Sequence, residues 1–159
     1  MVLSQTCYVS DLLEHASIGS CKSISTPLPS KGRTEPSSNE PYNDPTHKRN
    51  LVGGLQYLTC TRPNLSYRVN YACQFMHAPT IENFKLVKRI LRYVHGTADY
   101  GLQILSSNTL DVYAFSDVDW AGCPTTRHST TDFCTFLGSN CISWNTKKQP
   151  TVARSSTEA

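Results

Sequence analysis

The strongest constraint on the fold comes from residues 110–117, a stretch with the side-chain alternation of a β-strand whose last residue is Asp117. Side chains alternate between the two faces of a β-strand, so Tyr113, Phe115 and Asp117 share one face. Apolar residues also occur on the other face, which predicts a central strand covered on both sides, with Asp117 at its C-terminal end. The alternative is that Asp117 and Asp119 are ordinary solvated turn residues, and spacing alone favours that alternative.

Two further strands and the start of a helix are predicted after this stretch. Residues 131–137 form a second strand candidate, 138–140 contain the glycine and asparagine of a turn, and 141–145 predict a third strand. Residues 155–159 combine serine and threonine with an acid, which is typical of a helix N-terminus. The C-terminal segment therefore predicts a three-stranded, largely antiparallel sheet with short connections, followed by a helix.

The first 45 residues predict a helix and a linker. Ser4 is a suitable N-cap for a helix that runs to about residue 15, and residues 1–21 are assigned to this N-terminal helical segment. Residues 22–45 contain five of the chain's nine prolines, among serine, asparagine, lysine and glutamate. Such a composition buries too little apolar surface to offset the entropy of ordering, so we expect an extended or disordered linker.

Residues 46–109 predict a helical segment. Hydrophobic residues recur there at helical spacing, even across Gly53 and Gly54, which are expected to let a neighbouring element pack closely. Thr80 is a suitable N-cap for the last helix, and Gly96 is a suitable terminator. Helices are expected at residues 50–59, 63–76 and 81–95.

Four cations of the last helix, Lys85, Lys88, Arg89 and Arg92, recur at spacings of three and four on the side opposite its apolar stripe. A row of this kind is often only a solvated face. The functional interpretation is a surface that follows the phosphates of a nucleic-acid duplex without reading its sequence. The net charge of +3 does not by itself demand a nucleic-acid partner, so both interpretations stay open.

The cysteines and the hydropathy pattern bear on the compartment. Seven cysteines without a CxxC pair predict reduced thiols, and not a disulfide framework or a zinc site. No apolar run reaches the length of a membrane span, and the first residues do not resemble a signal peptide. These features predict an intracellular protein, nuclear or cytoplasmic, without a membrane partner.

Several longer motifs resemble one known family. The motif SDVDWAG at residues 116–122 belongs to the first predicted strand, and KKQPTVA at 147–153 follows the third. LVGGLQYLT at 51–59, TRPNLSY at 61–67 and KRILRYVHGT at 88–97 lie in the helical segment. Together they resemble the Pol polyproteins of copia-type LTR retrotransposons, from the connection after the polymerase active site into the first half of ribonuclease H.

The resemblance implies a fold, a family role and a site. The fold is α+β, with a helical, thumb-like connection of the reverse transcriptase at 46–109, then a truncated ribonuclease H-like domain at 110–159 with a partial, three-stranded antiparallel sheet. The family role is reverse transcription, with an RNA–DNA hybrid or duplex as partner and Mg²⁺ as cofactor. By this resemblance, Asp117 is the first of about four ribonuclease H acids and a Mg²⁺ ligand.

Most of the family's catalytic residues are expected to be missing. The second ribonuclease H acid should follow residue 159, and Glu158 is a weak candidate because it lies out of phase with that position. The polymerase Tyr-x-Asp-Asp motif does not occur, and Asp132 stands where the family usually has glycine. We therefore expect a truncated Pol-derived chain that is inactive on its own, with Asp117 vestigial and no Mg²⁺ stably bound.

Two alternatives to this hypothesis stay open. The first is a noncatalytic module that binds an RNA–DNA hybrid through the basic helix, with a partner supplying the missing half of the fold. The second is a structural interaction protein that self-associates by pairing through an exposed strand edge. Salt-dependent hybrid binding would favour the first, and a defined oligomer without nucleic acid would favour the second.

Overall fold

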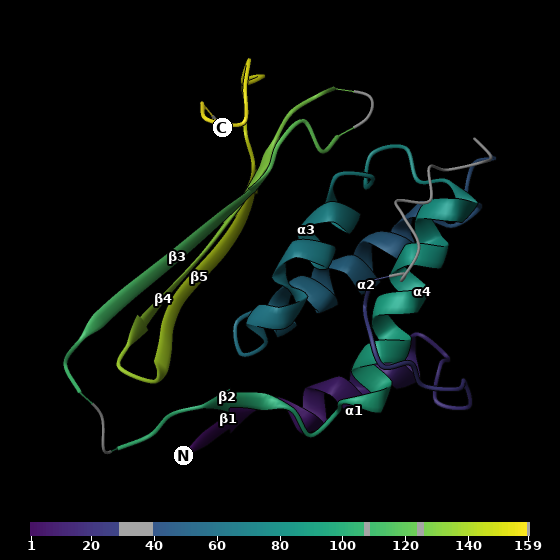
Figure 1. The fold of residues 1–159 in the computed structure, drawn as a ribbon. Coiled ribbons are helices and arrows are strands. Elements are labelled where there is room, and N and C mark those ends of the chain that lie inside the picture. The colour runs from purple at the N-terminus through teal and green to yellow at the C-terminus, as the bar shows by residue number, and fades with distance from the viewer. Residues whose placement is uncertain (29–39, 107–108, 124–125, 159) are drawn as a thin grey trace. The chain divides into compact units, whose positions relative to one another are not determined.

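The computed structural model describes residues 1–28, 40–106, 109–123 and 126–158, and their fold is mixed α+β (Figure 1). These residues form four α-helices, one short 3₁₀ helix and two antiparallel sheets. The chain divides into two compact units, Ser4–Gly101 and Met1–Leu3 with Leu102–Ala159. None of the helices in the described ranges is long and apolar enough to cross a membrane.

Two helices of the helical unit, α2 and α4, begin at local capping signals. The Asp44 side chain accepts a hydrogen bond from the backbone N of His47, and Pro45 occupies the first helical position, where its missing N–H costs nothing. Thr80 accepts from the backbone N of Asn83. The elements are α1 (Thr6–His15), α2 (Pro45–Leu58), the 3₁₀ helix η1 (Pro63–Leu65), α3 (Ser66–Cys73) and α4 (Ile81–Gly96).

One hydrophobic core lies between these helices. A Cβ atom added at Gly54 would lie 2.6 Å from Leu12 Cδ1, whereas one added at Gly53 would meet open space. The predicted close packing is therefore confirmed at Gly54 only, where α1 approaches α2. The buried core residues are Val9, Leu12, Leu13, Ile18, Leu51, Val52, Leu55, Leu58, Leu65, Val69, Ala72, Val87, Ile90, Leu91, Tyr93 and Val94.

The N-terminus differs from its prediction. Residues Val2–Ser4 form strand β1, which pairs with β2 (Gly101–Gln103), and the Met1 backbone exchanges hydrogen bonds with Ile104 at 2.9 and 2.8 Å. The helix starts only at Thr6, with Gln5 as an N-cap that makes no side-chain bond. Ser4 is thus part of a strand and does not cap the helix.

The described ends of the predicted linker are held against α4. On one side, the backbone N of Ile24 donates to Arg92 O at 3.4 Å. On the other, Tyr42 N donates to Pro79 O at 2.9 Å, and the Tyr42 ring stacks on Phe84 with centroids 4.2 Å apart. These flanks are therefore ordered through contacts near α4, while the assignment of residues 22–45 to a linker stays a prediction; residues 29–39 lie outside the described ranges.

The predicted three-stranded antiparallel sheet is confirmed. It consists of β3 (Val112–Asp119), β4 (Thr130–Leu137) and β5 (Asn140–Lys148), in the order β3-β4-β5. Gly138 adopts φ 54° in the turn between β4 and β5, a conformation that favours glycine. The register places Asp117 of β3 opposite Asp132 of β4.

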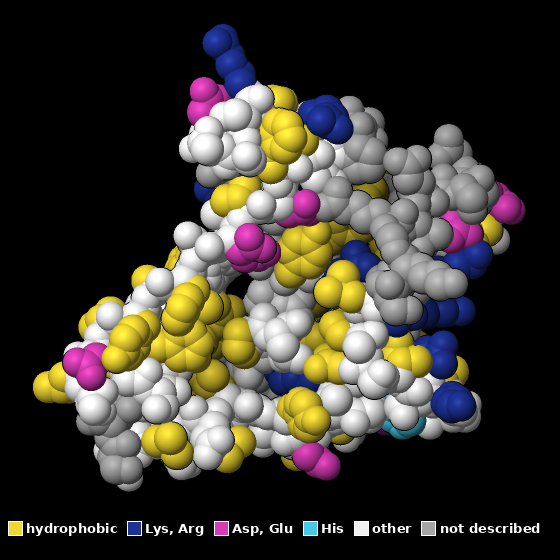
Figure 2. All heavy atoms as spheres, viewed as in Figure 1, with side chains coloured by type: hydrophobic (Ala, Val, Ile, Leu, Met, Phe, Trp, Pro, Cys, Tyr) yellow, Lys and Arg dark blue, Asp and Glu magenta, His cyan; other side chains and the backbone are white. Residues whose placement is uncertain are grey.

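Strand β3 is an edge strand and not the predicted central strand. It pairs only with β4 in the described sheet, and its side chains are exposed on both faces, including Val112 at 66% and Phe115 at 61%. Figure 2 shows hydrophobic side chains gathered over these strands. The strand also continues to Asp119, so Asp117 does not end it.

The predicted helix start near the C-terminus is absent from residues 155–158. This stretch forms bends and a turn, in which Glu158 N donates to Ser155 O at 3.3 Å. The Glu158 carboxylate in turn accepts from the backbone N of Arg154 at 3.1 Å. Its hydrogen bonds are therefore local to the turn.

Candidate nucleic-acid interface

Helix α4 presents the four predicted cations on its outer side. Val87, Leu91 and Val94 are fully buried, which fixes the rotation of the helix about its axis. The opposite side therefore faces solvent: the Lys85 and Lys88 side chains are exposed, and Arg89 and Arg92 are half-buried. The amphipathic pattern that predicted this face is confirmed.

Among the described residues, the two lysines make their contacts within their own helix. Lys85 Nζ lies 2.5 Å from Glu82 Oε1, one turn away, and its side chain remains 64% exposed. Lys88 Nζ lies 5.1 Å from the centroid of the Phe84 ring. Exposed ion pairs of this kind contribute little to stability. Lys85 could therefore leave Glu82 for a phosphate with only a small loss of free energy.

The two arginines hold the first residues of the predicted linker. Arg92 Nε donates to Lys22 O at 2.7 Å, and Arg89 Nη2 donates to Leu28 O at 2.8 Å and to Thr26 Oγ1 at 3.3 Å. A guanidinium carries five N–H donors, so each arginine keeps donors beyond these bonds. The contacts fix where the guanidinium groups lie, which the sequence does not reveal.

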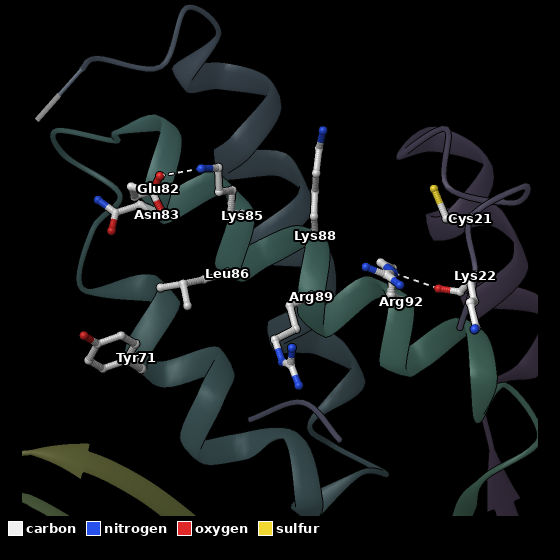
Figure 3. A pocket seen from close by; sticks show the side chains of 10 residues that line it. All are labelled: Cys21, Lys22, Tyr71, Glu82, Asn83, Lys85, Leu86, Lys88, Arg89 and Arg92. Atoms are coloured by element: carbon white, nitrogen blue, oxygen red, sulfur yellow. Dashed lines mark hydrogen bonds and ion pairs between the residues drawn. The ribbon is translucent and has the colours of Figure 1, made fainter. Parts of the chain in front are cut away.

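A pocket of about 610 Å³ lies along this side of α4. Figure 3 shows Leu86 of α4 pointing toward Tyr71 of α3, while Lys88 points away from both. Sequence reasoning missed this pocket because its walls come from three separate parts of the chain. Its lining residues are Cys21, Lys22, Tyr71, Glu82, Asn83, Lys85, Leu86, Lys88, Arg89 and Arg92.

The predicted catalytic acid has a partner that the sequence did not reveal. Asp117 and Asp132 are cross-strand neighbours, and Thr146 of β5 donates a hydrogen bond to Asp132 Oδ1. Burial raises the pKa of the Asp132 carboxyl; the Thr146 hydrogen bond opposes this, and the negative charge of Asp117 adds to it, with a raised pKa as the result. The pair is therefore a like-charge contact.

Three relatives are similar in sequence to nearly the whole of this chain. An uncharacterized mitochondrial protein of Arabidopsis thaliana, AtMg00810, is 56% identical over 99% of this chain and 65% of its own length. The retrovirus-related Pol polyprotein from transposon RE1 of the same plant is 45% identical over 99% of this chain. The corresponding polyprotein from tobacco transposon TNT 1-94 is 33% identical over 99%. This chain belongs to the Pol family of copia-type retrotransposons.

The match covers only a part of the longer Pol relatives. The Pol-derived chain spans 11% of the RE1 polyprotein, 12% of the TNT 1-94 polyprotein and 65% of the mitochondrial protein. No family model and no solved structure matches it. The helices and sheets of the structure show the mixed α+β class. Because no solved structure matches, the ribonuclease H-like part of the fold stays a prediction.

The described acids of the Pol-derived chain do not form the Mg²⁺ site that the resemblance implies. Two-metal hydrolysis needs several carboxylates that converge on ions about 4 Å apart. Asp117 and Asp132 face each other, but Glu158 is bonded within the C-terminal turn. Across the described ranges, no three His, Cys, Asp or Glu side chains converge as metal ligands would. Asp117 and Asp132 alone are too few for a two-metal centre.

One thiol of the Pol-derived chain differs chemically from the others. All seven cysteines are free thiols, as predicted. Burial would raise the pKa of Cys123, but hydrogen bonds involving Thr126 and the nearby Lys148 ammonium outweigh it and lower the pKa to about 7. Lys148 Nζ donates to Cys123 Sγ at 3.1 Å. The sequence gives no signal for this contact, because pairing of the strands creates it.

Proposed function

We propose that this Pol-derived chain is a noncatalytic segment that binds an RNA–DNA hybrid or a nucleic-acid duplex through the outer side of α4. The observation that carries the proposal is the row Lys85, Lys88, Arg89 and Arg92, which α4 places opposite its buried stripe. Such cations attract the phosphate backbone without reading bases. The family role of Pol in reverse transcription, carried over to this chain as part of the proposal, supplies the hybrid as a partner.

The chain's own acids support a binding role more than a catalytic one. Asp117 has one acidic neighbour, Asp132, across the strand pair, and two carboxylates are too few for a two-metal centre. The phosphate-facing cations do not depend on this acid pair. Binding without cleavage is therefore the activity that fits both the α4 cations and the acid pair. We also propose an intracellular location, nuclear or cytoplasmic.

The test is hybrid binding measured by fluorescence anisotropy over a series of salt concentrations. Lys88→Gln removes one exposed cation whose ammonium contacts only the Phe84 ring among the described residues. We expect weaker binding and a slope of log K against log salt that is less steep by about 1. The matched control is Lys147→Gln, which removes the same charge from exposed β5.

Three outcomes separate the interpretations. A loss of hybrid affinity that occurs in Lys88→Gln and not in Lys147→Gln supports an interface on α4. Equal losses in both variants indicate attraction by overall charge alone and contradict an interface on α4. Absence of salt-dependent binding by the unaltered chain overturns the proposed function.

The exposed sheet favours a second candidate function, self-association through β3. This strand has an unpaired edge in the described sheet and exposes Val112, Tyr113 and Phe115. Such edges readily pair with another strand. Analytical ultracentrifugation without nucleic acid tests this candidate: a defined dimer that Phe115→Lys dissociates supports it, and a monomer at all concentrations excludes it.

A further inference from the structure

The pocket beside α4 combines two kinds of wall within one compact unit. Leu86 and Tyr71 form an apolar side, and Figure 3 shows that Leu86 points toward the Tyr71 ring. Lys22, Arg89 and Arg92 supply positive charge along the other side. Its volume of about 610 Å³ lies within the range of small-ligand sites, about 300–1,000 Å³.

The arginine groups are positioned before any ligand arrives. Arg92 is bonded to Lys22 O at 2.7 Å, and Arg89 to Leu28 O at 2.8 Å. Arg89 Nε is also buried without a hydrogen-bond partner among the described residues. Guanidinium groups held in place lose less side-chain entropy when they bind, and their remaining N–H donors match the geometry of phosphate oxygens.

A ligand that fits both walls needs an anionic group and a flat apolar group a short distance apart. A nucleotide has both, because its phosphate meets guanidinium groups while its base packs on apolar or aromatic side chains. Bases in a continuous duplex are stacked and paired, so they cannot enter such a pocket. An unpaired nucleotide at a strand end has no such restriction.

We propose that this pocket holds one unpaired nucleotide of the nucleic acid that α4 binds, with its phosphate at Arg89 and Arg92 and its base against Leu86 and Tyr71. This rests on the proposed function and adds a preference to it. The chain would bind a duplex with a single-stranded overhang more tightly than the same duplex with blunt ends. The preference is for structure and not for sequence, because packing against an apolar wall accepts every base.

The first experiment compares two hybrids that differ only in an overhang of three nucleotides. We expect the full chain to bind the overhang hybrid at least about fivefold more tightly, as expected for one stacked base. Tyr71→Leu removes the ring but keeps apolar packing, and should bring the affinity ratio close to one. Tyr57→Leu is the matched control: Tyr57 is 56% exposed, lies outside the pocket, and should leave the ratio unchanged.

The second experiment uses a probe built into the pocket. Cys21 lines the pocket and is exposed, whereas Cys7 and Cys60 are exposed elsewhere in the same unit. Iodoacetamide labelling followed by peptide mass spectrometry measures all three thiols in one sample. We expect the overhang hybrid to slow labelling of Cys21 several-fold and to leave Cys7 and Cys60 unchanged, with less protection from the blunt hybrid.

The outcomes distinguish this inference from the proposed function. Salt-dependent binding of both hybrids with equal affinity and equal Cys21 labelling would overturn the pocket and keep the interface on α4. Binding of neither hybrid would overturn both. Free deoxythymidine monophosphate is a third arm: if it protects Cys21 as well as the overhang hybrid at equal concentration, the pocket is a site for free nucleotides and the strand-end proposal fails.

Discussion

Two buried cations show how single residues organise the helical unit. The Arg62 guanidinium donates to Thr97 O at 3.0 Å and to Thr97 Oγ1 at 2.6 Å, and it lies 5.8 Å and 5.6 Å from the Tyr93 and Tyr100 ring centroids. A cation is favourable there because the C-terminal end of α4 carries partial negative charge. Lys48, fully buried in α2, donates to Phe75 O at 2.8 Å. Both side chains connect elements far apart in sequence.

The first prediction concerns Lys48. Burial lowers the pKa of its ammonium to about 8, and the nearby Cys73 only partly opposes this. The unfolded chain therefore binds more protons between about pH 8 and 10.5, so this lysine makes stability rise with pH across that window. We expect Lys48→Met to remove that rise, measured as the difference in melting temperature from the unaltered chain by circular dichroism at 222 nm.

The control for this prediction is Arg49→Met in the next position. Arg49 is exposed, and its Nε donates to Met76 O at 3.1 Å. Its removal is expected to lower stability without changing the pH dependence. A pH profile of Lys48→Met that parallels the unaltered chain would show that Lys48 does not titrate as described.

The second prediction concerns Asp132. Its pKa is raised in the folded chain, so the protonated form stabilises the fold below about pH 4, and that contribution is lost as pH rises through the folded pKa. Asp132→Asn keeps an oxygen for the Thr146 hydrogen bond and removes the charge beside Asp117. We expect a gain of about 0.2–1 kcal/mol at pH 7, typical of relieving opposed like charges.

Tryptophan fluorescence measures this gain selectively, because both tryptophans, Trp120 and Trp144, belong to the sheet unit. Asp111→Asn, at an exposed position outside the acid pair, is the charge-matched control. If Asp132→Asn destabilises the chain at pH 7, the negative charge of Asp132 stabilises the fold, and the prediction is wrong.

At the scale of elements, α4 is the longest of the described helices. Its N-terminus is capped by Thr80, its first turn contains Glu82, and its inner side is continuous with the core. The same helix also holds the described ends of the predicted linker, through Arg92 and Phe84. Any loss of helical order at its N-terminus therefore affects both the core and the candidate interface.

The third prediction tests this helix through its cap. Thr80→Ala removes the hydrogen bond from Asn83 N to Thr80 Oγ1, which is 3.2 Å long. We expect the free energy of unfolding of the helical unit to fall by about 1 kcal/mol. Circular dichroism at 222 nm under urea measures it, and Thr80→Ser should restore most of the loss. Equal stabilities of Thr80→Ala and the unaltered chain would exclude a stabilising cap.

At the scale of the whole molecule, the two units differ in how they bury apolar surface. Every residue of the hydrophobic core lies in Ser4–Gly101. The sheet unit instead exposes large apolar side chains, a surface that commonly marks a binding site or a tendency to aggregate. They are Met1, Val2, Leu3, Leu105, Leu110, Val112, Tyr113, Phe115, Trp120, Phe133, Ile142 and Val152.

The fourth prediction follows from this difference. We expect the chain to bind a hydrophobic dye at neutral pH. We also expect the thermal transition followed by tryptophan fluorescence to lie at a lower temperature than the transition followed by circular dichroism at 222 nm. Phe115→Thr should reduce the dye signal, because Phe115 is 61% exposed on the edge strand. A single sharp transition, common to both signals and without dye binding, would contradict the prediction.

The fifth prediction concerns catalysis by the whole chain. We expect no cleavage of an RNA–DNA hybrid with Mg²⁺ or Mn²⁺, because Asp117 and Asp132 do not complete a two-metal site. The chain and Asp117→Asn should give equal background in a side-by-side assay. Metal-dependent cleavage that Asp117→Asn abolishes would instead establish an active ribonuclease.

Local signals in the sequence predicted local structure well. The cap at Thr80, the hydrophobic period and Gly96 predict α4, and the strand predicted at residues 131–137 matches β4 to within one residue at its start. These features depend on neighbours within about four residues, so a single sequence contains them. The predicted cap at Ser4 is wrong because Ser4 belongs to β1, which pairs with a strand about one hundred residues away.

The sequence by itself determined α4 and the strands β3, β4 and β5, which side of α4 carries charge, and which family the motifs resemble. Only the tertiary structure decided that β3 lies at an edge, that Asp132 faces Asp117, and that Arg89 and Arg92 hold residues 22–28 beside a pocket. The physical reason is range: alternation reports which side chains share a face, whereas burial and charge contacts depend on partners that folding brings from distant parts of the chain.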